Sequence, residues 1–222
     1  MDPDMARGSR HRFFMRSALL VMLLAASGCI VVKTHEITEM PVAAAREQPP
    51  GTAVTVEGVA TVASGTFDGG FALQDSSGGI YVTRALGKAV KTGDRVRVSG
   101  KLAAPDNQVA IDPGFIALPG PGSAPAPQEV RTGSVGPATE GRLIAVRGTL
   151  AREVENDPPW GWKIYLDDGS GPLLVFVSAK TKIAISGFHA GQLLRVVGFS
   201  GRYDQHTELL PRMPDDVAVI SE

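Results

Sequence analysis

The chain has 222 residues, a formal net charge of -1 and a single cysteine. This near-neutral balance excludes a generally basic protein that binds nucleic acid by charge alone. One cysteine excludes an internal disulfide framework.

The first 28 residues have the pattern of an export signal. A basic start is followed by the short apolar run "SALLVMLLAASG" (17–28), which ends in small residues just before Cys29. This pattern resembles a bacterial lipoprotein signal. The resemblance implies that residues 1–28 are removed and that Cys29 carries lipid and becomes the new N-terminus. The basic residues are Arg7, Arg10, Arg12 and Arg16.

An uncleaved membrane anchor is the alternative, because the apolar run continues to Val32. Residues 17–32 number 16, whereas a spanning helix needs roughly 20 apolar residues, so we favour the lipoprotein signal. The residue after Cys29 is Ile30. An aspartate at this position would resemble an inner-membrane retention signal. We therefore expect an exported chain that is anchored to a membrane through lipid on Cys29, at the outer membrane if the organism is Gram-negative.

The rest of the chain repeats itself. Without residues 1–28 it has 194 residues, with 18 basic and 21 acidic side chains and a formal charge of -3. "LQDSSGGIYV" (73–82) aligns on "LDDGSGPLLV" (166–175) at an offset of 93. "TGDRVRVSG" (92–100) aligns on "AGQLLRVVG" (190–198) at an offset of 98. These matches indicate one structural unit used twice.

Apolar residues alternate within each unit, which is typical of strands with one buried face. A stretch between the third and fourth strands of each unit has room for one short helix, and "VAAARE" (42–47) predicts another. Five short strands with such an insertion fit a small Greek-key barrel of the OB type, whereas a β-sandwich needs about seven strands. In the first unit we expect strands at 54–62, 71–74, 79–82, 95–102 and 108–111.

A proline- and glycine-rich segment separates the two units and predicts a linker. The expected fold is all-β, with two five-stranded OB-type Greek-key barrels in tandem after an N-terminal signal segment. The expected parts are a signal peptide (1–28), a tether (29–40), a first OB-fold domain (41–118), a linker (119–139) and a second OB-fold domain (140–222).

Several stretches also resemble a known family. "AAAREQPPGTAVTVEGVAT" (43–61), "EGRLIAVRGTL" (140–150), "YLDDGSGPLLVFV" (165–177) and "ELLPRMPDDVAVI" (208–220) are similar to the opening, centre and end of OB-fold domains in secreted bacterial proteins. Such domains often stand beside extracellular nuclease domains. The resemblance covers both units and implies a tandem OB-fold protein of the nucleic-acid-binding type. It also implies that Arg212 pins the C-terminal segment to the barrel, through Asp215 or Asp216.

The acidic turn at Asp167 and Asp168 invites a metal-site interpretation. Calcium loops need about six oxygen ligands at a set spacing, and this turn supplies two aspartates and a serine. The first unit has Asp75 at the equivalent place. Aspartate bonds readily to nearby backbone groups in turns, so we expect a hairpin between strands two and three and no metal site.

No catalytic set is visible in the sequence. His189 and His206 stand in no recognisable nucleophile or metal-binding spacing, and no glycine-rich phosphate loop is present. No nuclease domain accompanies the two units in this sequence. We therefore expect a non-enzymatic protein without a cofactor.

The loops of the two units differ. OB barrels bind ligands along strands two and three, between the loops that join strands one to two and four to five. In the second unit these loops, 152–163 and 199–207, contain aromatic and basic residues. The first-unit loops "ASGTFDGG" (63–70) and "AAPDNQ" (103–108) contain one phenylalanine and no basic residue. Aromatic planes beside guanidinium groups are suited to stack on nucleic-acid bases or sugar rings.

The ligand site is therefore expected in the second unit. Alternation places Lys163 and Tyr165 on the outward face of one strand, whereas Trp162 faces inward. Trp160 follows two prolines and is expected to be exposed. Packing of the barrel is the alternative role for these aromatic residues, and the sequence leaves it open. The candidate residues are Trp160, Lys163, Tyr165, Arg195, Phe199, Arg202 and Tyr203.

These patterns leave three functional hypotheses. The first is an envelope lipoprotein whose OB-fold modules bind single-stranded nucleic acid or another oligomeric ligand, mainly with the second module. The second is a scaffold lipoprotein that binds envelope proteins or cell-wall glycan. An enzyme ranks last because no assembled catalytic set is visible.

Overall fold

The computed structural model describes residues 39–221. These residues belong to one compact unit, which contains both barrels. The predictions for the signal peptide, for Cys29 and for most of the tether lie outside the described residues. Within residues 39–221, no helix is both long and apolar enough to cross a membrane.

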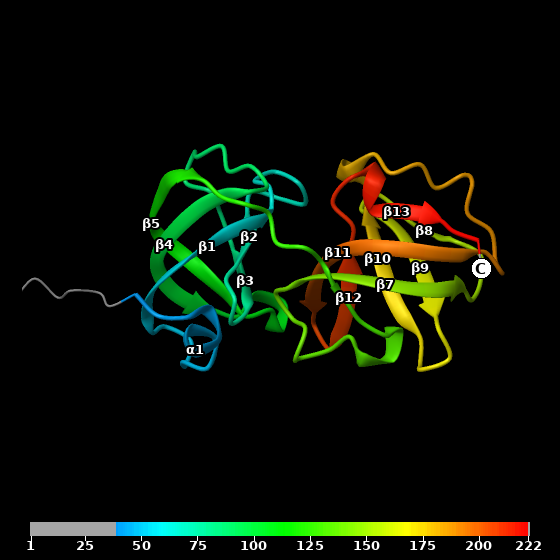
Figure 1. The fold of residues 1–222 in the computed structure, drawn as a ribbon, viewed down its shortest axis with the longest axis horizontal. Helices are drawn as coiled ribbons and strands as arrows, with labels where there is room; N and C mark the ends of the chain where they lie inside the picture. Colours follow the sequence, from blue (N-terminus) through cyan, green and yellow to red (C-terminus); the bar gives the residue numbers. More distant parts are fainter. Residues whose placement is uncertain (1–38, 222) are drawn as a thin grey trace, which may run out of the picture. The chain divides into compact units, whose positions relative to one another are not determined.

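The first barrel has five strands, which close on themselves (Figure 1). The strands are hydrogen-bonded in the order β1-β2-β3-β5-β4, and β4 pairs again with β1. β3 and β5 run parallel, and the other neighbours are antiparallel. This order is that of an OB-type Greek-key barrel, which confirms the predicted fold. The strands are β1 (Ala53–Val62), β2 (Phe71–Gln74), β3 (Gly79–Val82), β4 (Asp94–Ala103) and β5 (Ala110–Pro121).

The second barrel repeats this strand order. Its five main strands are β7 (Leu143–Leu150), β9 (Gly161–Asp167), β10 (Leu173–Ser178), β11 (Leu193–Tyr203) and β12 (His206–Leu210). β11 closes on β7, and β10 and β12 are the parallel pair. Three short strands extend this sheet, namely β6 (Gln128–Glu129) beside β7, β8 (Glu155–Asp157) beside β9 and β13 (Val217–Val219) beside β11.

Each barrel is filled by its own apolar core. Val54 and Val56 of β1 are fully buried in the first core, and Ile164 and Leu166 of β9 are fully buried in the second. Trp162 packs against the second core, as the alternation predicts. The two cores are separate clusters, so each unit folds around its own centre.

The repeated glycines mark a close approach of two strands. A side chain at Gly100 would place its Cβ 2.3 Å from the carbonyl oxygen of Asp112, and one at Gly198 would stand 2.6 Å from that of Leu210. Both glycines lie where the fourth strand crosses the fifth. The repeat at an offset of 98 therefore reflects the same backbone contact in both barrels.

The proline- and glycine-rich segment is structured at both ends. β5 continues to Pro121, and β6 pairs with β7 further along the chain. Val130 donates a backbone hydrogen bond of 2.9 Å to Ala145, and Val130 and Val135 pack against the second core. Two isolated valines give no apolar period, so the sequence offered no sign that residues 128–135 lie against the second barrel.

Two short helical segments stand at matching places before the barrels. α1 (Val42–Arg46) precedes β1, as expected, and the 3₁₀ turn Thr132–Ser134 precedes β7. The stretch between the third and fourth strands of the second barrel holds the short 3₁₀ helix Ala179–Thr181. The described part of the first-barrel stretch, residues 83–93, contains turns and no helix.

Candidate functional site

The acidic turn of the first barrel binds the chain segment that precedes the barrel. Asp75 accepts hydrogen bonds from the backbone N–H groups of Val42 at 2.9 Å and of Gly78 at 2.8 Å. Ser77 accepts another from Ala43 at 3.0 Å. Burial raises the pKa of Asp75, but the hydrogen bonds from Ser77, Val42 and Gly78 outweigh it and leave that pKa lowered.

The second barrel repeats this arrangement. Asp168 accepts hydrogen bonds of 2.9 Å from the hydroxyl of Thr132 and from the backbone of Ser170. Ser170 in turn accepts one from Gly133 at 2.9 Å. The hydroxyl of Ser170, with the donors on Thr132 and Arg131, outweighs burial and lowers the pKa of Asp168. Both acidic turns join the second and third strands of a barrel as the expected hairpins, and both hold the chain segment that enters the barrel.

The outward face of β2 and β3 is covered by the second barrel. Ala72 and Tyr81 are cross-strand partners and form one apolar cluster with Phe199 of β11. The ring centroids of Tyr81 and Phe199 are 5.7 Å apart, and Phe199 is 3% exposed. The backbone N–H of Leu143 donates to the side chain of Gln74 at 2.9 Å. The surface that an OB barrel uses for ligands is therefore occupied in the first barrel.

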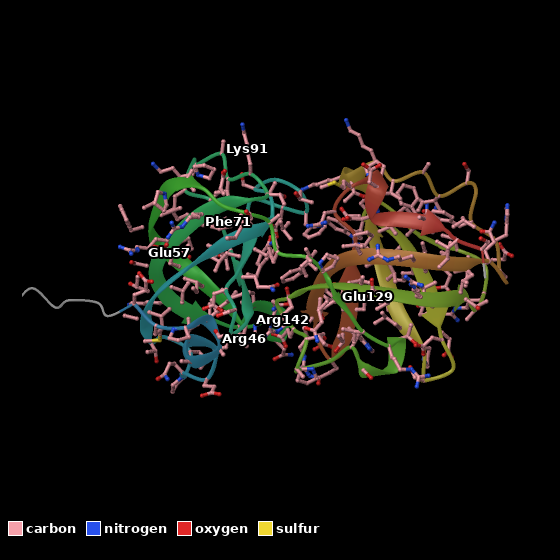
Figure 2. All side chains as sticks on the ribbon, viewed as in Figure 1. Arg46, Glu57, Phe71, Lys91, Glu129 and Arg142 are labelled. Carbon is pink, nitrogen blue, oxygen red and sulfur yellow. The ribbon has the colours of Figure 1, made fainter. Side chains whose placement is uncertain are left out.

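A buried carboxylate joins the two barrels beside this contact. Glu140 is 7% exposed, and its carboxylate lies 3.1 Å from the guanidinium of Arg46. It also accepts hydrogen bonds from the side chain of Gln108 at 3.1 Å and from the backbone N–H of Val109 at 3.2 Å. Arg142 donates to the carbonyl of Ser77, and Figure 2 labels Arg46 and Arg142, which line the same hollow. The buried charge is thus fully paired.

Arg212 ties the C-terminal segment to both barrels. Its guanidinium donates to both carboxylate oxygens of Asp216, at 2.8 and 2.9 Å. A third hydrogen bond of 2.7 Å reaches the carbonyl of Thr61 in β1. The expected pin is therefore made with Asp216, and it also extends to the first barrel.

The matching face of the second barrel forms the floor of a hollow of about 560 Å³. β9, β10 and β12 lie side by side there. Side chains in these strands alternate between the core and the outer surface, and those on the outer surface are partly buried or exposed. We call this surface the ligand face; it comprises Lys163, Tyr165, Leu174, Phe176, His206 and Glu208.

The loop that includes β8 supplies charged partners to this face. The guanidinium carbon of Arg152 lies 3.6 Å from the centroid of the Tyr165 ring, a cation–π contact. The ammonium of Lys163 lies 2.9 Å from the carboxylate of Asp157. The hydrogen bond to Asp157 raises the pKa of Lys163. β8 pairs with β9, so the loop is held beside the strand that carries both residues.

Glu208 is the acidic group of the ligand face. It stands opposite Leu174 of β10 and Gly201 of β11. No hydrogen bond or ion pair joins its carboxylate to another side chain or backbone group within residues 39–221. Burial raises the pKa of Glu208 to about 7, and the charge of Lys163 acts in the opposite direction. Near neutral pH the carboxyl is thus divided between its charged and neutral forms.

The structure groups four of the predicted ligand residues around the second barrel's loops and ligand face. Lys163 and Tyr165 lie on the ligand face itself. Trp160 stands at the tip of the loop before β9 and is 70% exposed, and Tyr203 at the end of β11 is 61% exposed.

The other three predicted residues lie elsewhere. Arg195 faces outward on β11, but its guanidinium is 2.7 Å from the carboxylate of Glu129 in β6. Arg202 lines a separate hollow beside the first barrel. Phe199 does not belong to the ligand face, because the first barrel buries it.

Sequence reasoning missed Arg152, Phe176 and Glu208 as members or partners of the face. Phe176 alternates with the buried residues Val175 and Val177 in β10, so its outward position could have been predicted from the sequence. Arg152 opens the aromatic loop, but its contact with Tyr165 depends on the β8 hairpin. Nothing in the sequence marks Glu208, because its raised pKa depends on packing.

Within residues 39–221, no group of three histidine, cysteine, aspartate or glutamate side chains is arranged to hold a metal ion.

The chain is similar to solved structures of DNA-binding proteins at low sequence identity. A murine DNA-binding protein with double-stranded DNA has a TM-score of 0.38 and 12% identity, over 76% of this chain and 97% of that one. A replication protein A heterotrimer with single-stranded DNA has a TM-score of 0.32 and 7% identity, over 83% and 70%. The single-stranded-DNA-binding protein of Thermus aquaticus has a TM-score of 0.27 and 15% identity, over 78% and 96%.

Sequence comparisons give no match. No family model matches the chain, and no curated protein sequence matches it. TM-scores of this size carry no argument about the ligand, so the assignment of two OB-type barrels rests on the strand order itself.

Proposed function

We propose that the second barrel binds single-stranded nucleic acid across the ligand face. The observation that carries this proposal is the Tyr165 ring, which lies outward on β9 with the Arg152 guanidinium 3.6 Å from its centroid. An aromatic ring with a neighbouring cation stacks on bases of any sequence, and each stacked base contributes roughly 1–3 kcal/mol. Phe176 and the exposed Trp160 add two further aromatic surfaces.

The charges of the second barrel support a binding mode that depends on stacking. Residues 142–220 hold nine basic and nine acidic side chains, and Lys163 is already paired with Asp157. Few phosphates are therefore neutralised on binding. Because salt dependence for single strands scales at about -0.7 per neutralised phosphate, we expect modest affinity with a shallow dependence on salt.

A fluorescence anisotropy titration of the purified protein with labelled single-stranded oligothymidine at low salt tests this proposal. Tyr165→Ala is expected to weaken binding by about tenfold or more, the value of one stacked base. Phe115→Ala is the matched control, because it removes a ring that is 57% exposed on β5 of the first barrel. Absence of binding at high micromolar protein, or equal losses in the two variants, would contradict the proposal.

Cell-wall glycan is a second candidate ligand, and the carboxylates around the face favour it. Asp157 and Glu208 repel phosphates but accept hydrogen bonds from sugar hydroxyls, while the same rings stack on sugar rings. Titration with soluble peptidoglycan fragments separates the candidates. Glycan binding that Tyr165→Ala abolishes, without oligonucleotide binding, would assign the face to glycan. Capture of envelope proteins in place of both ligands would assign a scaffold role.

We infer that the chain is a non-enzymatic binding protein held at a membrane by lipid on Cys29. The basic start, the short apolar run and the cysteine that follows support this inference. Metabolic labelling with radioactive palmitate is expected to label the natural chain and not Cys29→Ser; equal labelling would contradict the lipid anchor. A hydrolase screen that found turnover abolished by Asp168→Ala would contradict the non-enzymatic role.

A further inference from the structure

A second hollow borders the ligand face at Glu208, where the first barrel meets the hairpin of β11 and β12. Its volume is about 290 Å³. The first barrel contributes Phe67, Asp68 and Tyr81 to its lining, and the hairpin contributes Tyr203 and Glu208. Aromatic rings and carboxylates are thus combined in one open hollow.

Hydrogen bonds between the barrels hold the walls of this hollow in place. The side-chain oxygen of Gln108 accepts from the backbone of Arg202 at 2.7 Å, while its amide nitrogen donates to Glu140 at 3.1 Å. The backbone N–H of Asp204 donates to the carbonyl of Asp106 at 2.8 Å. Because both walls are already ordered, a ligand would not have to order them on binding.

The aromatic part of the lining is also fixed. The ring of Tyr81 lies 5.7 Å from that of Phe199, at an interplanar angle of 50°, and its hydroxyl donates to Asp68. Phe67 packs in the same cluster. The faces of aromatic rings carry negative charge density, which attracts cations.

The charged part of the lining is mainly acidic. Asp68, Asp106 and Glu208 line the hollow with one basic residue, Arg202, whose Nε donates to the carbonyl of Asp204 at 3.2 Å. Glu208 has no hydrogen-bond or ion-pair partner within residues 39–221. Glu208 is partly buried, and a bound cation would provide the partner that its carboxylate lacks.

We propose that this hollow binds a small organic cation, a primary ammonium on a short hydrocarbon chain. The ammonium lies at the carboxylates of Glu208 and Asp68, and the hydrocarbon chain lies against the rings of Phe67 and Tyr81. This site goes beyond the proposed function and does not rest on it: it shares Glu208 with the ligand face, but its aromatic walls, Phe67 and Tyr81, belong to the first barrel.

The binding of such a cation is expected to depend on pH. Burial raises the pKa of Glu208 to about 7, so its charged fraction rises about tenfold between pH 6 and pH 8. The charged or titratable groups around Glu208 are Asp68 and Asp106 from the first barrel, Arg202 and His206 from the hairpin and Lys163 from β9.

Isothermal titration of the purified protein with 1,5-diaminopentane tests the site, and the uncharged 1,5-pentanediol serves as the matched ligand. We expect the diamine to bind at pH 8, to bind about tenfold more weakly at pH 6, and the diol not to bind. Glu208→Gln keeps the shape of the side chain and removes its charge, so it is expected to weaken diamine binding at pH 8 by about tenfold or more.

Asp112→Asn is the control variant, because that carboxylate pairs with Arg84 on the surface of the first barrel; it should leave diamine binding unchanged. Phe67→Ala should weaken binding through loss of the aromatic wall. No diamine binding at 10 mM (about 100 times a 0.1 mM protein sample), equal binding of diol and diamine, or unchanged affinity in Glu208→Gln would overturn the proposal.

Discussion

The two barrels share one strand order, but their equivalent faces have opposite roles. In the first barrel the outward face of β2 and β3 is packed against Phe199 of the second barrel. In the second barrel the equivalent face carries Lys163 and Tyr165, which line a hollow. One copy of the duplicated barrel thus packs this face against the other copy, whereas the second barrel leaves the equivalent face open.

The size of the outward side chains explains this difference. At the offset of 93, Ala72 of the first barrel corresponds to Tyr165 of the second. Gly79 also lies at the contact, where an added Cβ would stand 1.9 Å from the carbonyl oxygen of Gly141. Small residues allow close approach of the second barrel, whereas a tyrosine keeps the equivalent surface from such packing.

The largest expected effect follows from removal of the ring that covers the first face. Phe199→Ala should lower the free energy of unfolding by about 3–5 kcal/mol, because it deletes a buried aromatic side chain and leaves a cavity. Urea denaturation measures this change. The exposed ring of Phe115 gives the control, and its replacement by alanine should cost well under about 1 kcal/mol. Equal costs would mean that Phe199 is not buried between the barrels.

Loss of the buried carboxylate at the contact should have the next largest effect. Glu140→Ala leaves Arg46 without its partner in a site where that guanidinium is 16% exposed. The expected cost is about 3 kcal/mol, again measured by urea denaturation. Arg84→Ala, which breaks a solvent-exposed ion pair with Asp112, should cost less than about 1 kcal/mol. A double variant with Arg46→Ala should cost less than the two single changes together.

The acidic turns should behave alike in both barrels, because they make the same contacts. Asp75→Asn and Asp168→Asn should each lower the free energy of unfolding by about 1 kcal/mol at pH 7, through loss of hydrogen bonds to a charged acceptor. The pKa of each aspartate is lowered in the folded state. Its contribution is therefore present above the unfolded pKa and is lost as pH falls through the folded pKa. The difference between each variant and the natural chain should narrow as pH falls below the unfolded value of about 3.8; a difference that did not change with pH would contradict this origin.

A stability effect of the opposite sign is expected at Glu208. Its pKa is raised to about 7 from 4.5, so its stabilising effect is complete below the unfolded pKa and is lost as pH rises through 7. Glu208→Gln resembles the protonated form and should be more stable than the natural chain at pH 8 by about 1–2 kcal/mol. At pH 4 the two should be equal. Thermal unfolding at the two pH values measures this, and equal stability at pH 8 would show that the carboxyl is well solvated.

Local features of this fold could be predicted from the sequence. The alternation of apolar residues predicted the strands, and the repeat placed the hairpin at Asp168 in register with that at Asp75. Trp162 was correctly expected to face inward, because strand alternation decides its side. Trp160 was correctly expected to be exposed, because it lies in a loop after two prolines.

The contact between the barrels could not be predicted in this way. Phe199 is an aromatic residue in a loop that was expected to bind a ligand. Its burial depends on Ala72 and Tyr81, which are far away in the chain. The burial of Glu140 and of Glu208 likewise depends on which surfaces meet. No periodic pattern encodes such pairing, so the candidate residues chosen from the sequence include Phe199, which belongs to the contact between the barrels.

The unequal roles of the two faces are tested most directly by NMR titration of the isotope-labelled protein with single-stranded oligothymidine. We expect chemical-shift changes at the ligand face, at Tyr165, Leu174 and Phe176, with the signals of Ala72 and Tyr81 unchanged. Shifts centred on Ala72 and Tyr81, with none at Tyr165, would contradict the account, because the covered face of the first barrel would then be the one that binds.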